Sequence, residues 1–145
     1  MKKTILTVLA AVTTLAATSP ALAQEVAAGK TSFNKCMACH AVGEGAKNKV
    51  GPELNELFGR VAGTAPDFKY SQAMTDAGAG GLVWSSETLH QFLTKPKDFV
   101  KGTKMSFPGL KEQADLDNIV AYLQTFSTAP ADAAAPAEPA APAAQ

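Results

Sequence analysis

The chain of 145 residues carries 13 basic and 13 acidic side chains, so its formal net charge is zero. This balance gives no reason to expect a nucleic-acid partner or a membrane-surface partner, and the length allows a single domain. Two cysteines are too few for a disulfide framework.

The first 23 residues are typical of a secretory signal peptide. Lys2 and Lys3 precede an apolar run, and Ala21-Leu22-Ala23 supplies the small residues of a cleavage site. The run is short for a membrane span, and no second one follows. We therefore expect cleavage of residues 1–23 before Gln24 and no stable membrane insertion. Retention as an uncleaved anchor is the alternative.

Residues 25–35 are predicted to form the first helix, because Val26, Gly29 and Phe33 fall on one face. A glycine inside a helix costs about 1 kcal/mol relative to alanine. Close approach of another helix at Gly29 would compensate for that cost.

The segment Cys36-Met37-Ala38-Cys39-His40 follows, and it is the pattern for covalent attachment of a c-type haem. Each thiol adds across one vinyl group of the porphyrin, so the two sulfurs must lie about one helical turn apart. The histidine next to them can then offer a ring nitrogen to the iron. A disulfide between the same cysteines would close a loop too short to stabilise a fold.

Shorter elements are predicted in the middle of the chain. Pro52 opens a short helical piece that Gly59 ends. Ser71 caps a turn of helix that Gly78 closes, and residues 78–81 form a flexible loop.

Two helices are predicted in the second half. Ser85 or Ser86 caps a helix that stops before Pro96, and Asp115 caps the last helix of the chain. Their inward positions are Leu89, Phe92 and Leu93 in the first, and Leu116, Ile119, Val120 and Leu123 in the second. No alternating strand pattern appears, so we expect an all-α fold.

Met105 lies between these helices, in a segment that Gly102, Pro108 and Gly109 mark as a loop. A methionine in a core stripe would be a simple gap filler. In an ordered loop, with the haem iron still lacking a sixth ligand, we expect its thioether to bind the iron.

The C-terminal segment, residues 127–145, consists mainly of Ala and Pro and has no large apolar residue. It is therefore predicted to be a disordered tail. The folded domain is then residues 24–126, and a core of that size is marginal without help. A buried haem would add much of the missing apolar volume.

Over residues 26–126 the chain resembles class I c-type cytochromes, in particular the bacterial cytochrome c2 type. The resemblance implies the small all-α cytochrome c fold around one covalently bound haem c. Besides the CMACH motif, it is carried by Gly29, Phe33, Gly51-Pro52-Glu53-Leu54, Leu57-Phe58-Gly59-Arg60, Tyr70, Trp84, Leu89, Lys95-Pro96-Lys97, Gly102-Thr103-Lys104-Met105 and Ala121-Tyr122-Leu123.

The resemblance also implies roles for single residues. Cys36 and Cys39 hold the haem, and His40 and Met105 are the axial ligands. The carbonyl of Pro52 accepts from the other ring nitrogen of His40. The residues that match positions at the haem propionates are Arg60, Tyr70 and Trp84.

Two positions depart from the family pattern. Phe92 stands where many relatives have a tyrosine near the methionine sulfur, and Lys101 replaces a proline before the ligand loop.

Lysines gather near the haem motif and the methionine loop, whereas acids collect on the last helix and around residues 53–56. A positive face can raise encounter rates with an acidic partner by roughly 10 to 10³. The residues expected at this docking face are Lys35, Lys97, Lys104 and Phe107.

The sequence thus indicates a monomeric periplasmic electron carrier and not an enzyme. A relative of this kind would move electrons from a cytochrome bc complex or a dehydrogenase to a terminal oxidase, a reaction centre or a reductase. A gas or redox sensor with a weak methionine ligand is the main alternative. A peroxidase would need distal acid–base groups, yet the only other histidine, His90, is expected on the solvent side of its helix.

Overall fold

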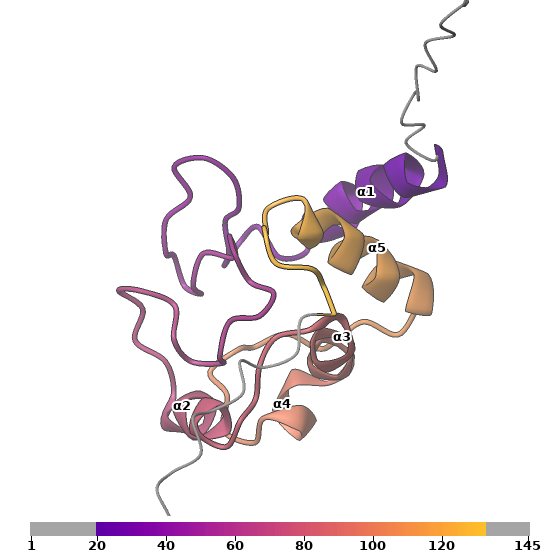
Figure 1. The fold of residues 1–145 in the computed structure, drawn as a ribbon. Helices are drawn as coiled ribbons and strands as arrows, with labels where there is room; N and C mark the ends of the chain where they lie inside the picture. Colours follow the sequence, from indigo (N-terminus) through magenta and orange to yellow (C-terminus); the bar gives the residue numbers. More distant parts are fainter. Residues whose placement is uncertain (1–19, 133–145) are drawn as a thin grey trace, which may run out of the picture.

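The computed structural model describes residues 20–132, and Figure 1 shows their arrangement. The helices in this part of the chain are α1 (Pro20–Phe33), α2 (Gln72–Ala79), α3 (Ser86–Thr94), α4 (Pro96–Phe99) and α5 (Gln113–Gln124). Within residues 20–132, extended segments pair only at an isolated bridge between Val61 and Val83. The all-α prediction is confirmed for these residues.

Helices α1 and α5, from opposite ends of the chain, lie against each other (Figure 1). Gly29 allows this contact, since a Cβ there would lie 1.9 Å from the carbonyl oxygen of Asn118 and 2.6 Å from Cβ of Tyr122. The rings of Phe33 and Tyr122 pack beside it, with centroids 5.4 Å apart. The close helix approach predicted at Gly29 is confirmed.

Asp115 does not cap α5, contrary to the prediction. The N-cap residue is Glu112, which makes no side-chain capping bond. The Asp115 carboxylate instead accepts from the hydroxyl of Ser32 at 2.8 Å and from Nζ of Lys35 at 2.9 Å. It therefore ties α5 to the end of α1, where two side-chain donors are available.

The caps of the two middle helices agree with the sequence analysis. Ser71 accepts from the main-chain N–H of Met74 at the start of α2, and Ser85 forms a capping box with Thr88 at the start of α3. Leu89, Phe92 and Leu93 are buried as expected.

Helix α2 does not close at Gly78 but continues to Ala79 and has Gly80 as its C-cap. The predicted flexible loop thus begins later than expected. Gly78 is buried inside the helix because the Ala62 carbonyl lies where its Cβ would be, at 1.9 Å.

The short helix predicted from Pro52 to Gly59 is absent, and the segment is a series of turns. Its N–H groups bond to distant parts of the chain: Leu54 donates to the Ala41 carbonyl at 3.0 Å, and Gly59 donates to the Trp84 carbonyl at 2.8 Å. Its apolar residues still enter the core. The four-residue helix α4, which begins at Pro96, was not predicted.

The apolar core joins α1, α3 and α5 to the segments between them, and no described helix has the length and hydropathy needed to cross a bilayer. The most deeply buried members of the core include Phe33, Leu57, Phe58, Ala62, Ile119 and Leu123.

Residues 127–132 pack against the domain, although the sequence analysis placed the end of the folded domain at residue 126. Within residues 127–132, Ser127 and Thr128 bond to Leu57 and Glu56, and Ala131 packs against the core. The rest of the predicted tail, and residues 1–19 of the predicted signal peptide, lie outside the described residues.

Candidate haem-binding site

A cavity of about 420 Å³ lies inside the domain, a size typical of a small-molecule or cofactor site. Apolar side chains from α1, α3 and α5 and from the intervening loops line it. All eight residues predicted to bind the cofactor contribute to this lining: Cys36, Cys39, His40, Pro52, Arg60, Tyr70, Trp84 and Met105.

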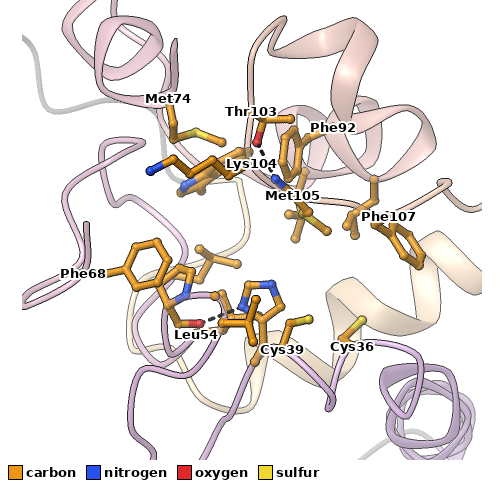
Figure 2. A pocket seen from close by; sticks show the side chains of 18 of the residues that line it. Cys36, Cys39, Leu54, Phe68, Met74, Phe92, Thr103, Lys104, Met105 and Phe107 are labelled. Carbon is orange, nitrogen blue, oxygen red and sulfur yellow. Dashed lines mark hydrogen bonds between the residues drawn. The ribbon is translucent and has the colours of Figure 1, made fainter. Parts of the chain in front are cut away.

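The CMACH segment follows α1 as a run of turns that forms one side of the cavity. Cys36 N–H donates to the Phe33 carbonyl at 2.8 Å, and His40 N–H donates to the Cys36 carbonyl at 2.9 Å. Both cysteines are free thiols, and Figure 2 shows their sulfurs on the same side of the cavity. The main chain thus closes one turn between the two cysteines, as the motif implied.

The Cys36 thiol is held in its neutral form. Burial raises its pKa to about 11, although the positive charge of Lys35 acts in the opposite direction. Thiols that exchange disulfides have a lowered pKa. Cys36 therefore lacks the lowered pKa of a thioredoxin-like redox cysteine.

The imidazole of His40 is oriented by the chain itself. Its Nδ1 lies 2.7 Å from the Pro52 carbonyl oxygen, and since a carbonyl can only accept, Nδ1 carries the proton. Nε2 is then left with a free lone pair. Burial lowers the pKa of His40, the Pro52 bond opposes this shift, and the charge of Lys49 adds to it. The neutral form, which binds metals, is thereby favoured.

Gly51 is a site residue whose role the sequence analysis missed. A Cβ at this position would lie 2.4 Å from Cε1 of His40 and 2.8 Å from each of its ring nitrogens. Only glycine lets the main chain lie against the imidazole so closely. The Gly-Pro pair indicated a turn, but nothing in its pattern indicated a contact with the ring.

Met105 lies across the cavity from the two cysteines (Figure 2). Its main-chain N–H donates to the Thr103 hydroxyl at 3.3 Å, and Gly102 before them has a left-handed φ of 96°. Phe92 and Phe107 lie beside Met105 in the same view. The loop thus presents a thioether to the same apolar space that the CMACH segment borders.

Met74 also lines the cavity and is buried, which the sequence analysis did not anticipate. Its position in α2, at an ordinary inward spacing, made it indistinguishable from a core methionine. Figure 2 shows it on the same side of the cavity as Met105, beyond Lys104. The cavity therefore contains two thioether sulfurs.

Polar groups enter the cavity lining from the segment around Arg60. Its guanidinium donates to the carbonyls of Asn55 at 3.2 Å and Glu53 at 3.4 Å, and it lies 3.7 Å from the Glu53 carboxylate. Burial raises the pKa of the Tyr70 phenol, and the positive charge of Arg60 opposes that rise. Arg60 and Tyr70 together form a polar region in an otherwise apolar lining.

A main-chain hydrogen bond holds Trp84 next to Arg60. Its N–H donates to the Arg60 carbonyl at 3.0 Å, and its ring packs on Phe92 with centroids 5.1 Å apart. The structure thus brings together all three residues that the resemblance assigned to the propionate positions.

The predicted docking residues do not form a single cluster. Lys35, Lys104 and Phe107 line the haem-site cavity, whereas Lys97 lines a second cavity of about 450 Å³ between α4 and residues 106–108. Phe107 borders both cavities, and Lys35 is paired with Asp115.

His90 is not on the solvent side of α3, contrary to expectation. Its Nε2 is buried and lies 3.4 Å from the Asp117 carboxylate of α5. The periodicity that placed it outside did not account for α5 crossing this face. His90 is not among the residues that line the cavity.

The model of the family described as "Cytochrome c" matches residues 26–127. The chain belongs to the cytochrome c family. It is 60% identical over 103 residues to cytochrome c2 of Afifella marina, which covers 71% of this chain and 83% of that protein. It is 52% identical over 100 residues to cytochrome c-550 of Bradyrhizobium diazoefficiens, covering 69% and 71%.

Solved structures give the same result. A cytochrome c2 structure from Rhodospirillum centenum superposes with a TM-score of 0.68 at 40% identity and covers 70% of this chain and 98% of that one. Cytochrome cH from Methylobacterium extorquens superposes with a TM-score of 0.63 at 42% identity, covering 69% and 97%. The resemblance to cytochrome c2 and the fold that it implies are confirmed.

As a member of this family, the protein binds one covalently attached haem c and transfers electrons, and it is not an enzyme. The donor set fits a c-type haem. Two free cysteines, an imidazole with a free Nε2 and a thioether border one largely apolar cavity. In this cytochrome, Gly51 and Pro52 fix the His40 ring at the edge of the cavity that would hold the haem.

Proposed function

We propose that the protein is a periplasmic one-electron carrier whose haem iron is bound by His40 and Met105. The observation that carries the proposal is the placement of the Met105 thioether across one apolar cavity from the CMACH segment, where Pro52 fixes His40 as its Nδ1–H tautomer. The haem, when bound, supplies an iron that gains or loses one electron.

The chain's own residues prepare this chemistry without opening a position for a substrate. Pro52 and Gly51 keep the His40 ring in one orientation, so little rearrangement accompanies a change in charge at the iron. A thioether ligand from Met105 would favour the reduced state of the iron and would place the potential toward the high end of the haem range. The largely apolar lining would limit the access of water to the cofactor.

Export before haem attachment is part of the proposal. The signal-like features of residues 1–23 support it. Helix α1 begins at Pro20, but the contacts of Gly29 and Phe33 lie beyond the expected cleavage before Gln24. A cleaved chain would keep these contacts. Intact mass of the protein recovered from a periplasmic fraction tests the cleavage position.

The proposed partners are redox proteins that dock briefly at the haem edge. A cytochrome bc complex or a dehydrogenase would donate the electron, and a terminal oxidase, a reaction centre or a reductase would accept it. Lys35, Lys104 and Phe107 border the haem cavity, and Lys97 lies on the other side of Phe107. This mixture of positive charge and an aromatic ring suits a monomer that forms short-lived complexes with acidic surfaces.

The ligand assignment is tested by comparing the two cavity methionines. Met105→Ala should abolish the weak red charge-transfer band of methionine-ligated ferric haem, lower the reduction potential and let the ferrous protein bind carbon monoxide. Met74→Ala removes a thioether from the same cavity and should leave the band in place. Loss of the band in Met74→Ala, with retention in Met105→Ala, would reverse the assignment.

A further inference from the structure

Residues 52–60 form one wall of the haem cavity without any regular structure. Leu54, Leu57 and Arg60 from this wall line the cavity. Its two ends are held by main-chain bonds to other segments, from Leu54 to the Ala41 carbonyl and from Gly59 to the Trp84 carbonyl. Between these two bonds, the main-chain N–H groups of Glu56 and Leu57 need acceptors from another segment.

The segment that follows α5 supplies these acceptors. Glu56 N–H donates to the Phe126 carbonyl at 2.9 Å, and Leu57 N–H donates to the Ser127 hydroxyl at 3.0 Å. Both the N–H and the hydroxyl of Thr128 donate to Oε2 of Glu56, each at 2.8 Å. These two donors lower the pKa of Glu56.

Glu56 needs such support because its main chain has a φ of 49°, in the left-handed region. A residue with a Cβ pays roughly 1–3 kcal/mol for that conformation and keeps it only where its surroundings enforce it. The bonds to residues 126–128 act on both its main chain and its side chain, and so provide that enforcement.

The segment that follows α5 is itself held in place by contacts at residues 129 and 131. The Ala131 carbonyl accepts from the N–H of Ser86 at the start of α3, at 2.6 Å, and the Ala129 carbonyl accepts from the Gln124 side chain at 2.8 Å. Ala131 also packs against the core. The family match ends at residue 127, so most of these contacts lie beyond it.

We propose that residues 127–132, the C-terminal strap, hold the middle of the 52–60 wall in place and thereby position Leu57 at the haem, with Thr128 as the positioning residue. The strap connects the wall to the N-terminus of α3, so one short segment joins two parts of the cavity lining. Without it, the wall opens locally at Glu56 and Leu57 and admits water to the haem.

The test uses the full-length, haem-loaded protein and native-state amide hydrogen exchange. Thr128→Val removes the hydroxyl donor but keeps the N–H, and should speed exchange at the Glu56 and Leu57 amides about fivefold. Thr128→Ser restores the hydroxyl and should restore the slow exchange. A chain ending after Phe126 should speed exchange there further, whereas one ending after Asp132 should behave as the full chain does.

Two further readouts separate positioning from general stability. Exchange at Ile119, in the core of α5, should stay unchanged in Thr128→Val, because a local opening leaves the helices intact. The reduction potential should fall, since water at the haem favours the more highly charged oxidised state. Equal acceleration at Ile119, unchanged exchange at Leu57, or an unchanged potential in Thr128→Val would each overturn the proposal.

Discussion

Replacing Gly51 by Ala should loosen His40, the proposed haem ligand. The added Cβ would stand 2.4 Å from Cε1 of the ring, about 1 Å closer than the 3.4 Å at which ordinary contact begins. The ring cannot retreat freely, because its Nδ1–H is bonded to the neighbouring Pro52 carbonyl at 2.7 Å. Either the main chain or the imidazole has to move.

The cost follows from these two constraints. Overpacking of this kind costs about 1–3 kcal/mol, and weakening the Nδ1–H bond adds about 0.5–1.5 kcal/mol. We expect a total loss of about 1.5–4.5 kcal/mol in unfolding free energy, which at about 4–8 °C per kcal/mol lowers the melting temperature by roughly 6–36 °C. Thermal unfolding of the oxidised haem protein, followed by circular dichroism, measures it.

Gly45→Ala is the matched control. Gly45 has a left-handed φ of 71°, but a Cβ there would meet nothing within 4 Å. It should cost only the conformational strain, about 1–2 kcal/mol, and leave the paramagnetically shifted NMR signals of the His40 ring unchanged. Gly51→Ala should shift those signals. Wild-type melting of Gly51→Ala, or an equal loss in Gly45→Ala, would refute the reasoning.

Three other changes test the wider account. The double change Cys36→Ala and Cys39→Ala should leave the chain largely unfolded, because so small a domain lacks the core that the haem completes; a well-dispersed NMR spectrum of this haem-free variant would contradict that. Lys104→Glu should slow electron transfer to an acidic acceptor in stopped-flow measurements, and the loss should shrink as salt rises; a loss that is independent of salt would exclude a charge effect. Asp115→Asn should destabilise the protein at neutral pH and progressively less in acid. The Lys35 and Ser32 donors lower the pKa of Asp115 in the folded state. The ionised carboxylate therefore stabilises the fold above the unfolded pKa of Asp115, and this effect disappears as the pH falls through the folded pKa. Denaturant unfolding across pH, with equal losses at all values, would contradict this reasoning.

Features with a local cause could be predicted from the sequence. Ser71 and Ser85 cap their helices because a hydroxyl needs only the N–H groups of the next turn. The apolar face of α5 follows from its periodicity alone. The CMACH segment specifies its chemistry by adjacent residues, so the cofactor could be identified without the fold.

The sequence predictions were wrong where a residue's hydrogen-bond partner lies far away in the sequence. Asp115 lies near the start of α5, where a capping residue is expected. Its carboxylate instead accepts hydrogen bonds from Ser32 and Lys35, some 80 residues away in sequence. Residues 52–59 had helical spacing of apolar residues, but their N–H groups bonded elsewhere in the chain. The functions of Gly51 and Met74 depend on which ring or cavity they meet, and no local pattern records that.

The pairing of α1 with α5 has a consequence for how the molecule is made. Gly29 and Ser32 belong to the first helix, while their contacts, Asn118 and Asp115, belong to the last. A chain that emerges from its N-terminus therefore presents both cysteines long before the helix that closes the core exists. Contacts so remote in sequence form slowly. Until α5 has packed against α1, the two cysteines lie on a chain whose core is not yet closed.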